Sequence, residues 1–381
     1  MLRHNLSRIL SNIPGWHTNR KIVVIESDDW GSIRMPSKKV YEKCLKNGYL
    51  VNENPYERYD SLASEEDLEL LFELLSSFKD INGNHPIITA NCLVANPDFA
   101  RIKKNNFERY YFELITETFK RYPCHYNNFN LWQQGMSAKI FHPQFHGREH
   151  LNVNLFLNAL RKKERDAMFG FENEMPGCIS LGPETKGNIY VDATFYDSFE
   201  GKNELIPILN EGLEIFRKIF GYWSGSIIPT NYTWSPDFDQ MVKEKGVFYF
   251  QGIRKIREPI PGGKFKYHTI HLGKKNKLGQ LYLVRNVHFE PSLFTLRIKD
   301  PVDQCLSDMQ IAFKMHKPVV ISSHRINYVG FIDKTNRDKT LKMLHQVFTT
   351  ASKYWPDIEY TTSDQLGGII MEDYNNSIFH F

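Results

Sequence analysis

Cysteine is scarce in this sequence, and no two cysteines stand close together. The 381 residues include five, Cys44, Cys92, Cys124, Cys178 and Cys305, and no CxxC motif. This spacing excludes a disulfide scaffold and a thiolate zinc site, and it fits a reducing compartment. The first 20 residues also lack the apolar core of a signal peptide, so we expect a cytoplasmic protein.

Long apolar runs and a strong net charge are missing as well. No run approaches the length that spans a bilayer, so no membrane span is expected. The net charge of +4 is small for this length, which argues against a nucleic-acid partner. No glycine-rich phosphate-binding loop is visible, because Gly262-Gly263-Lys264 lacks the required spacing. Nothing in the sequence fixes an oligomeric state.

Apolar runs that predict strands alternate with helical patterns from one end of the chain to the other. The predicted strands cover 22–26, 86–94, 139–141, 188–194, 224–228, 247–251, 281–289, 318–322 and 358–361. This alternation predicts an α/β fold with a parallel sheet.

We expect a single-domain distorted (β/α) barrel over residues 21–381, with seven strands rather than eight, preceded by a helical extension at 1–20. An open doubly wound sheet is the alternative. Insertions at about 50–64, 164–187 and 254–280 account for the remaining length.

The first predicted strand ends in two adjacent aspartates, Asp28 and Asp29, followed by Trp30 and Gly31. In an α/β fold the carboxyl ends of parallel strands carry the site. Neighbouring residues on an extended chain point in opposite directions, unless the chain has already turned. We therefore expect the two aspartates to have different roles, one as a metal ligand and the other in proton transfer. A solvated acidic turn is the plainer alternative.

Three histidines, His142, His146 and His150, lie within nine residues. Pro143 suits the first position of a helix, which predicts that a helix opens here and runs to about residue 163. Neutral imidazoles four residues apart are a recurring way to hold a divalent ion. We expect His142 and His146 to be ligands, with His150 as an alternative ligand beside His146 or as a supporting residue. Zinc, with one aspartate as third ligand, is the expected ion.

A further histidine, His324, ends the predicted strand at 318–322. If the strand ends share one edge, His324 meets the aspartates and the paired histidines there. Its pKa near neutrality suits a proton donor to a leaving group. A histidine that merely caps the strand end is the alternative.

Together, ESDDWG, HPQFH and VVISSH resemble the polysaccharide deacetylases of carbohydrate esterase family 4. The resemblance runs from about residue 23 to 324. The family has a Thr-Phe-Asp-Asp first motif, a His-Ser/Thr-x-x-His second motif and a Leu-x-Leu-His fifth motif on a distorted seven-stranded barrel. The resemblance implies that Asp28 is the general base and that His324 is the general acid. It also implies that Asp29, His142 and His146 hold the metal.

The third and fourth motifs of that family are not preserved. The third, Arg-x-Pro-Tyr, is best matched by IIPT at 227–230, without the arginine and with Tyr232 two places late. A backbone N–H near Thr230 could still stabilise an oxyanion. Arg148, Arg285 or Arg325 could replace the lost charge, and the fourth-motif aspartate has no counterpart. These departures indicate a substrate other than chitin or peptidoglycan strands.

The sequence therefore predicts a zinc-dependent hydrolase that removes an N- or O-acetyl group from a sugar or polysaccharide precursor. Aromatic residues make up 14% of the chain, and Trp30 and Trp234, which lie beside motif positions, are candidates to stack on a sugar. Two alternatives remain open: a glycoside hydrolase that uses carboxylates, and a catalytically inactive barrel that binds glycans.

Overall fold

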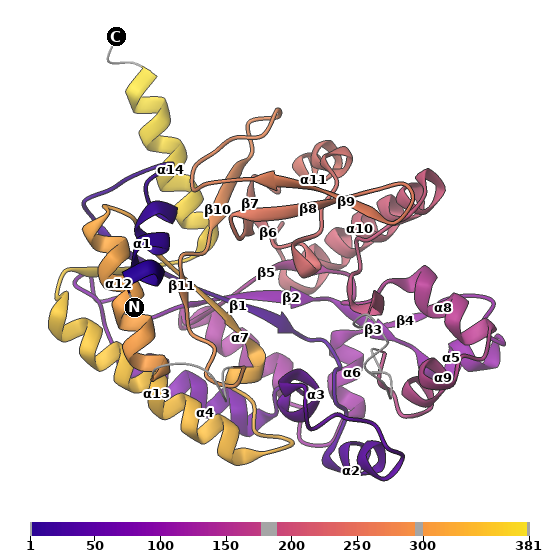
Figure 1. Cartoon of the computed structure of the whole chain (residues 1–381). Helices are drawn as coiled ribbons and strands as arrows, with labels where there is room; N and C mark the ends of the chain where they lie inside the picture. The colour runs from indigo at the N-terminus through magenta and orange to yellow at the C-terminus, as the bar shows by residue number, and fades with distance from the viewer. Residues whose placement is uncertain (1, 177–188, 294–299, 379–381) are drawn as a thin grey trace.

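A long buried strand, β1 (Lys21–Trp30), runs through the middle of the protein, as the computed structural model shows (Figure 1). The structure describes residues 2–176, 189–293 and 300–378. In the sheet, β1 pairs with parallel neighbours on both sides, β2 (Ile88–Leu93) and β12 (Val319–His324). Its β-branched, apolar start favours this doubly covered position.

The remaining strands continue the parallel sheet in both directions. The order is β10 (Leu281–Val284), β7 (Tyr249–Gly252), β6 (Ser226–Ile227), β5 (Phe141–Gly147), β2, β1, β12 and β11 (Val287–His288), and β13 (Ile358–Thr361) also pairs with β1. The two ends of this path, β10 and β11, follow each other directly in the chain. The N–H of Arg285 donates to Gly252 on one side, and the N–H of Asn286 donates to Val320 on the other. The sheet therefore curls back on itself.

This arrangement confirms the predicted (β/α) barrel and rules out the open sheet. The described residues contain eight strands along the path rather than the predicted seven. The reason is local: the predicted strand at 281–289 is divided at Arg285 and Asn286, where the chain changes its pairing from β7 to β12.

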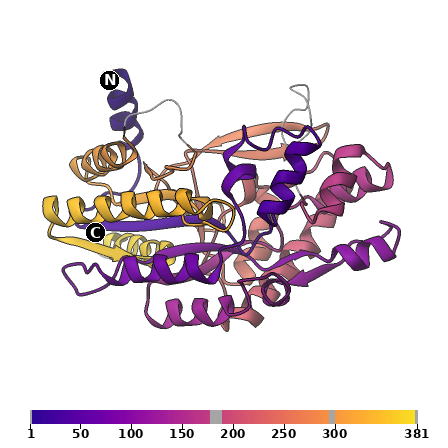
Figure 2. The ribbon, with the colours of Figure 1, turned by 90° about the horizontal axis from the view of Figure 1, so that it is seen from below.

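Helices cover the outside of the sheet, and several smaller elements fill the connections. The α-helices are α1 (Leu2–Ser11), α2 (Lys38–Lys46), α3 (Pro55–Tyr59), α4 (Glu65–Ser76), α5 (Phe99–Lys104), α6 (Ile115–Arg121), α7 (Asn128–Ser137), α8 (Val153–Arg161), α9 (Arg165–Glu172), α10 (Phe199–Phe220), α11 (Asp239–Glu244), α12 (Pro301–Lys314), α13 (Lys334–Tyr354) and α14 (Ser363–Ile378). The short elements are η1 (Ile189–Val191), η2 (Thr230–Tyr232), η3 (Pro236–Phe238), η4 (Arg325–Asn327) and the pairs β3 (Ala95–Pro97) with β4 (Phe112–Leu114) and β8 (Lys255–Ile260) with β9 (Lys264–Thr269). Figure 2 shows α4 and α13 lying side by side along the sheet.

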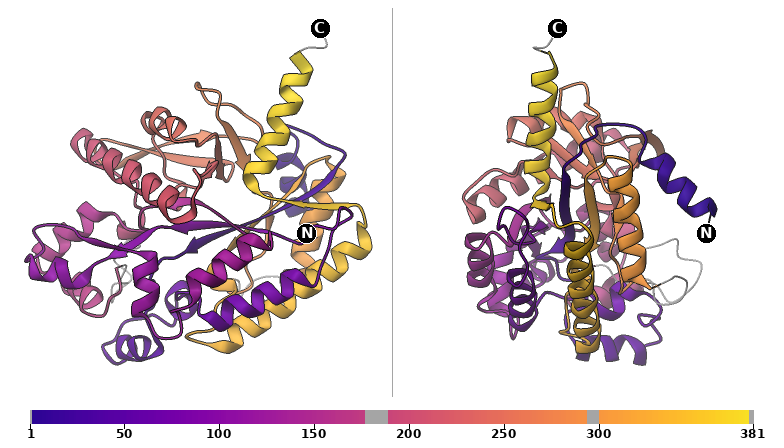
Figure 3. Two further views of the ribbon diagram at one scale, coloured as in Figure 1. Left: turned by 180° about the vertical axis from the view of Figure 1, so that it is seen from behind. Right: turned by 90° about the vertical axis from the view of Figure 1, so that its left-hand side faces the viewer.

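Side chains on β1 alternate between two environments. Val23 and Ile25 face outward into the large core beneath the helices. Ile22 and Val24 face inward and pack against Leu366 of α14, which covers the amino-terminal end of the barrel before it extends away from the body (Figure 3). Alternate residues of β1 therefore face the outer core and the barrel interior. At its amino-terminal end, the barrel interior is apolar.

The three insertions differ in structure. The first, 50–64, contains α3, and the third, 254–280, contains the β8–β9 hairpin. Residues 177–187 of the second insertion lie outside the described residues, and so does Asn188, the first residue of the strand predicted at 188–194. Of the described part of that strand, 189–191 form η1 instead, and 192–194 belong to no strand or helix. Within the described ranges, no helix has a stretch long and apolar enough to cross a lipid bilayer.

Candidate metal centre and active site

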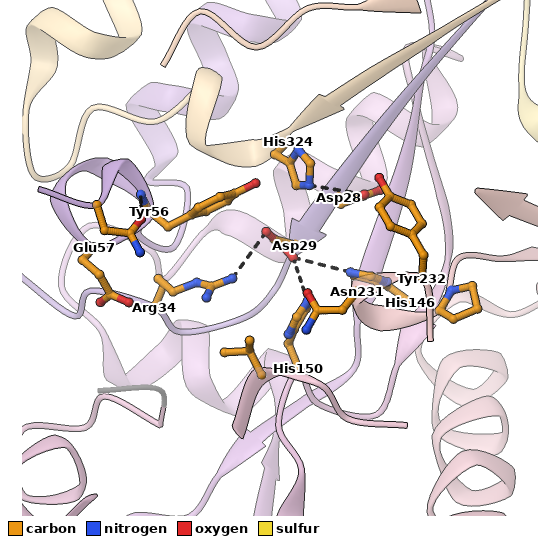
Figure 4. Close-up of a pocket in the computed structure, with 13 residues that line it drawn as sticks. Asp28, Asp29, Arg34, Tyr56, Glu57, His146, His150, Asn231, Tyr232 and His324 are labelled. Atoms are coloured by element: carbon orange, nitrogen blue, oxygen red, sulfur yellow. Dashed lines mark hydrogen bonds and ion pairs between the residues drawn. The ribbon is translucent and has the colours of Figure 1, made fainter. Parts of the chain in front are cut away.

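The site residues come from the carboxyl ends of three parallel strands. Asp28 and Asp29 end β1, His146 lies near the end of β5, and His324 ends β12. Asp28 and His324 are direct neighbours in the strand register. Because all three strands are parallel, their ends meet at one edge of the barrel, where these side chains surround a common cavity (Figure 4).

The backbone of β1 turns at Asp29, and this turn lets both aspartates face the cavity. Asp29 has φ = +74°, a left-handed conformation that is strained for a residue other than glycine. The register between β1 and β2 shifts at the same place. The next left-handed residue is Gly31, where a Cβ atom would lie 2.6 Å from the carbonyl oxygen of Leu93. The turn thus removes the alternation that would otherwise send Asp28 and Asp29 to opposite sides.

Asp29, His146 and His150 form a compact group of potential metal ligands. The Oδ1 atom of Asp29 lies 3.4 Å from the Nε2 atom of His146 and 3.4 Å from the Nε2 atom of His150. All three ligand atoms lie within 4.8 Å of one another. Tetrahedral zinc, with ligand distances of about 2.0–2.1 Å, places its ligand atoms about 3.3 Å apart. The spacing of these residues therefore fits a zinc-sized cation.

Both imidazoles also present a ring nitrogen, Nε2, to the same aspartate oxygen. The Nδ1–H of His146 donates to the carbonyl oxygen of Ile228 at 2.7 Å, which leaves Nε2 free to bind a cation. Burial, helped by His146 and Arg34 and opposed by Asp29, lowers the pKa of His150 to about 3. Burial alone would raise the pKa of Asp29, but its hydrogen bond with His146, together with nearby His150 and Arg34, keeps it well below its usual range. The group offers two imidazole nitrogens and one carboxylate oxygen as potential ligand atoms.

The expected ligand His142 lies elsewhere, and this prediction is wrong. Residues 141–147 form β5 instead of opening a helix, and the next helix, α8, begins at Val153. On a strand, residues four apart share a face but lie about 13 Å from each other. The Nε2 atom of His142 is 3.2 Å from Asp364 Oδ2, on α14. His150 takes the expected place, which matches the alternative that pairs His150 with His146.

Asp28 is held by a buried arginine, Arg285, at the junction between β10 and β11. The Arg285 guanidinium donates to both carboxylate oxygens, at 2.6 and 2.8 Å, and Asn91 Nδ2 donates to Oδ1 at 2.7 Å. Arg285 also donates to Glu26, one inward position earlier on β1, at 2.5 Å. Burial would raise the pKa of Asp28, but the charge and hydrogen bonds of Arg285 lower it to about 2. Among the three arginines considered, Arg285 is the one whose guanidinium binds Asp28.

His324 has a carboxylate partner that the sequence did not reveal. Its Nδ1 atom lies 2.6 Å from Glu290 Oε1, and its Nε2 atom points to Asp28 Oδ2 at 3.5 Å. Asn327 donates to the second oxygen of Glu290 at 2.7 Å and fixes the orientation of the carboxylate. Burial lowers the pKa of His324, but the charge and hydrogen bond of Glu290 raise it to about 9. His324 is therefore protonated at neutral pH, with Glu290 as the carboxylate that stabilises its charge.

The two tryptophans proposed to stack on a sugar are core residues. Trp30 is fully buried and packs edge-on against Phe141 with ring centroids 5.1 Å apart. Trp234 is buried against Phe250, and its indole N–H donates to Asp239 at 2.8 Å. Neither lines the cavity between Asp29 and His324.

The other three secondary candidates have different surroundings. Tyr232 lines the cavity, and its hydroxyl is 3.4 Å from the Nη1 atom of Arg285. Thr230 is buried behind the cavity, and its hydroxyl accepts from the N–H of Ala193 at 3.0 Å. Arg325 is fully buried and donates to both oxygens of Asp60, at 3.0 and 2.9 Å. Of the three, Tyr232 alone faces the cavity.

The cavity has a volume of about 240 Å³, and part of its wall comes from residues that the sequence did not single out. Arg34 follows β1, and Asn54, Tyr56 and Glu57 belong to α3 and its N-cap. The pair Asn54-Pro55 is a recognisable N-cap and first helical position, so a short helix at this point was detectable.

Comparisons with known proteins leave the family open. No family model and no curated protein matches the chain. Similar solved structures include the PuuE allantoinase (TM-score 0.46, 11% identity, 92% of this chain and 91% of that one) and a "probable polysaccharide deacetylase" from Pseudomonas aeruginosa PAO1 (0.44, 10%, 92% and 90%). A third is 4-α-glucanotransferase from Thermococcus litoralis (0.42, 10%, 91% of this chain), of which the chain spans 40% of the length. At these values they assign neither a family nor an activity.

Proposed function

We propose that this protein is a metal-dependent hydrolase that removes an acetyl group from a nitrogen or oxygen of a sugar or polysaccharide precursor. The observation that carries the proposal is the meeting of three separately anchored groups at one cavity. These are the ligand group of Asp29, His146 and His150, the Asp28–Arg285 pair and the His324–Glu290 pair.

The residues fit the division of labour that amide hydrolysis requires. A divalent cation held by Asp29, His146 and His150, with Zn²⁺ as the best fit, would supply Lewis acidity toward the acyl oxygen and acidify a water. Asp28, kept ionised by Arg285, accepts a proton from the attacking water as the new C–O bond forms. His324, kept protonated by Glu290, gives its proton to the nitrogen as the C–N bond breaks. The products are acetate and a free amine.

The same geometry serves a glycosidase less well. That reaction needs one ionised carboxylate and one protonated carboxylic acid on either side of the glycosidic bond. Asp28 is bound at both oxygens by Arg285, and Asp29 lies against two imidazoles. Both groups have lowered pKa values, so neither is placed to act as the acid.

The proposed substrate class, an acetylated sugar, rests on the motif resemblance. The proposed cellular compartment rests on the cysteines. The described cysteines, Cys44, Cys92, Cys124 and Cys305, are all free thiols. Free thiols fit a reducing compartment, and we propose that the enzyme serves cytoplasmic glycan assembly.

The test is release of acetate from N-acetylated amino sugars by protein loaded with one zinc ion per chain. We expect acetate and free amine in equal amounts, lost after chelation and lost in the Asp28→Asn protein. Release of a reducing sugar without acetate would instead support the glycosidase. Sugar binding without release of either product would support a non-catalytic glycan-binding protein.

A further inference from the structure

Glu57, on α3, is a buried carboxyl group that the proposed chemistry does not use. It is 2% exposed, and its Oε2 atom has no hydrogen-bond partner among the described residues. It lines the same cavity as Asp29 and His324 (Figure 4). Buried Asp60, which also faces Arg34, has both of its oxygens satisfied, since it accepts two hydrogen bonds from Arg325. A buried carboxyl oxygen without a partner destabilises the fold, unless something that the cavity admits completes it.

Arg34 is the cationic partner in the same wall. Its closest carboxylate contacts, with Asp29 and Asp60, are both 3.6 Å, which is longer than a hydrogen bond. Its guanidinium lies 5.2 Å from the centre of the Tyr56 ring. A guanidinium carries five N–H donors, so Arg34 retains donors for a group in the cavity. We call Arg34, Asn54, Tyr56 and Glu57 the α3 subsite.

The charges around this subsite disfavour both kinds of ion. An anionic ligand would approach Arg34 among three carboxyl groups, those of Asp29, Asp60 and Glu57. A cationic ligand would approach the guanidinium of Arg34 and, beyond it, the proposed metal. A neutral hydroxyl group avoids both repulsions, because its O–H can donate to Glu57 while its oxygen accepts from Arg34. Burial raises the pKa of Glu57 to about 7, so near neutral pH the carboxyl can also donate.

Helix α3 is held firmly enough to present these groups in one place. Asn54 caps the helix by accepting from the N–H of Tyr56 at 3.0 Å, and Pro55 occupies its first position. The ring of Tyr56 lies edge-on to His324, with centroids 5.6 Å apart. The subsite is thus directly beside the proposed acid, within reach of the part of a substrate next to the acetyl group.

We propose that the α3 subsite binds neutral ring hydroxyls of the substrate, with Glu57 and Arg34 as the groups that recognise them. This rests on the proposed function for the position of the acetyl group. It narrows the substrate class to an acetylated sugar with free hydroxyls on the ring that carries the acetyl group, and it makes Glu57 a specificity-determining residue.

The test compares two ring compounds by titration calorimetry: methyl N-acetyl-β-D-glucosaminide, and N-cyclohexylacetamide, which lacks ring hydroxyls. Zinc-loaded Asp28→Asn protein is used so that no turnover occurs. We expect the sugar to bind at least tenfold more tightly than the cyclohexyl compound. Adding Glu57→Met should weaken sugar binding about tenfold or more and change cyclohexylacetamide binding less than threefold. Glu53→Met, an exposed position on the same insertion, should change neither.

A thermal unfolding scan separates recognition from a structural role. Because Glu57 has an unpartnered oxygen, Glu57→Met should keep or raise Tm, whereas a residue that supports the fold would lower it. Three outcomes would overturn the subsite. Glu57→Met could weaken the binding of both compounds equally, or it could leave sugar binding unchanged. The third outcome is that the Asp28→Asn protein does not bind the sugar at all. These measurements of binding and unfolding involve no hydrolysis. Failure of the subsite proposal can therefore be distinguished from failure of the proposed activity, which is measured by acetate release.

Discussion

The strand β5 carries two histidines that each contact a carboxylate, and only His146 belongs to the candidate metal centre. At the start of the strand, His142 Nε2 lies 3.2 Å from Asp364, with side chains 27% and 26% exposed. Near its end, His146 Nε2 lies 3.4 Å from Asp29, with side chains 3% and 4% exposed. A histidine–carboxylate contact is thus found at both ends of the barrel. The difference lies in what surrounds it.

Three features distinguish the buried pair. A second imidazole, that of His150, points at the same aspartate oxygen, and the Ile228 carbonyl fixes the tautomer of His146. The aspartate itself is in a strained backbone conformation. His142 instead stacks on Tyr222 and shares a hydrogen bond with Gln144. The candidate metal centre is therefore inferred from the convergence of independently held groups, and the spacing of two histidines in the sequence does not replace it.

The largest effect should follow removal of a ligand from the buried pair. His146→Ala and His150→Ala should each reduce bound zinc from about one ion per chain to near zero. The acetate-releasing activity should fall roughly 10³-fold, since a catalytic cation supplies several kcal/mol of transition-state stabilisation. Elemental analysis of purified protein, beside kcat/KM, checks both. If either variant retains its full zinc content, the substituted histidine is not a ligand of the metal.

Asp28→Asn should have the next largest effect, and it should leave the metal in place. Loss of a general base lowers kcat by about 10²- to 10⁴-fold. The matched control is Asp364→Asn, which alters the carboxylate of the other pair and should change kcat by less than twofold. Steady-state kinetics and zinc content measured together separate the two roles. A parallel loss of zinc in Asp28→Asn would mean that Asp28 is itself a ligand.

Local patterns in the sequence predicted the fold and part of the site. The buried start of β1 and its terminal aspartates were recognisable, because a strand and its carboxyl end follow from local residues. The segment at 142–147 was taken for a helix start because Pro143 fits that position. Its period of two, with His142, Gln144 and His146 inward and Phe145 in the outer core, indicates a strand. The polar barrel interior concealed this pattern.

Partners that are distant in the chain could not be assigned from local pattern. Arg285 reaches Asp28 across 257 residues, and Glu290 reaches His324 across 34. Three arginines fitted the first role equally well, and no motif marked Glu290. The turn at Asp29 was likewise hidden, since it depends on the packing of Gly31 against Leu93. These features arise from tertiary contacts, and the sequence specifies them only through the complete fold.

A smaller effect should appear in the pH profile when Glu290 is changed. The pKa of His324 is raised to about 9, so the protonated acid is present below that pH and is lost as the pH rises through it. In Glu290→Gln the alkaline midpoint of kcat/KM should fall by at least about one pH unit toward the ordinary histidine value near 6.5. Glu258→Gln, which alters the partner of His268 on the β8–β9 hairpin, should leave the profile unchanged. An unshifted profile in Glu290→Gln would exclude His324 as the titrating acid.

The smallest effect is expected at the partly exposed pair, and it completes the comparison. His142→Ala should retain full zinc content and kcat/KM within twofold of the parent protein. Because His142 and Asp364 are each about one-quarter exposed, their contact should contribute about 1 kcal/mol or less to the free energy of unfolding. Urea unfolding at neutral pH measures this difference. If His142→Ala instead loses zinc, the cation lies at the amino-terminal end of the barrel, and the group around Asp29 is a buried charge network without a metal.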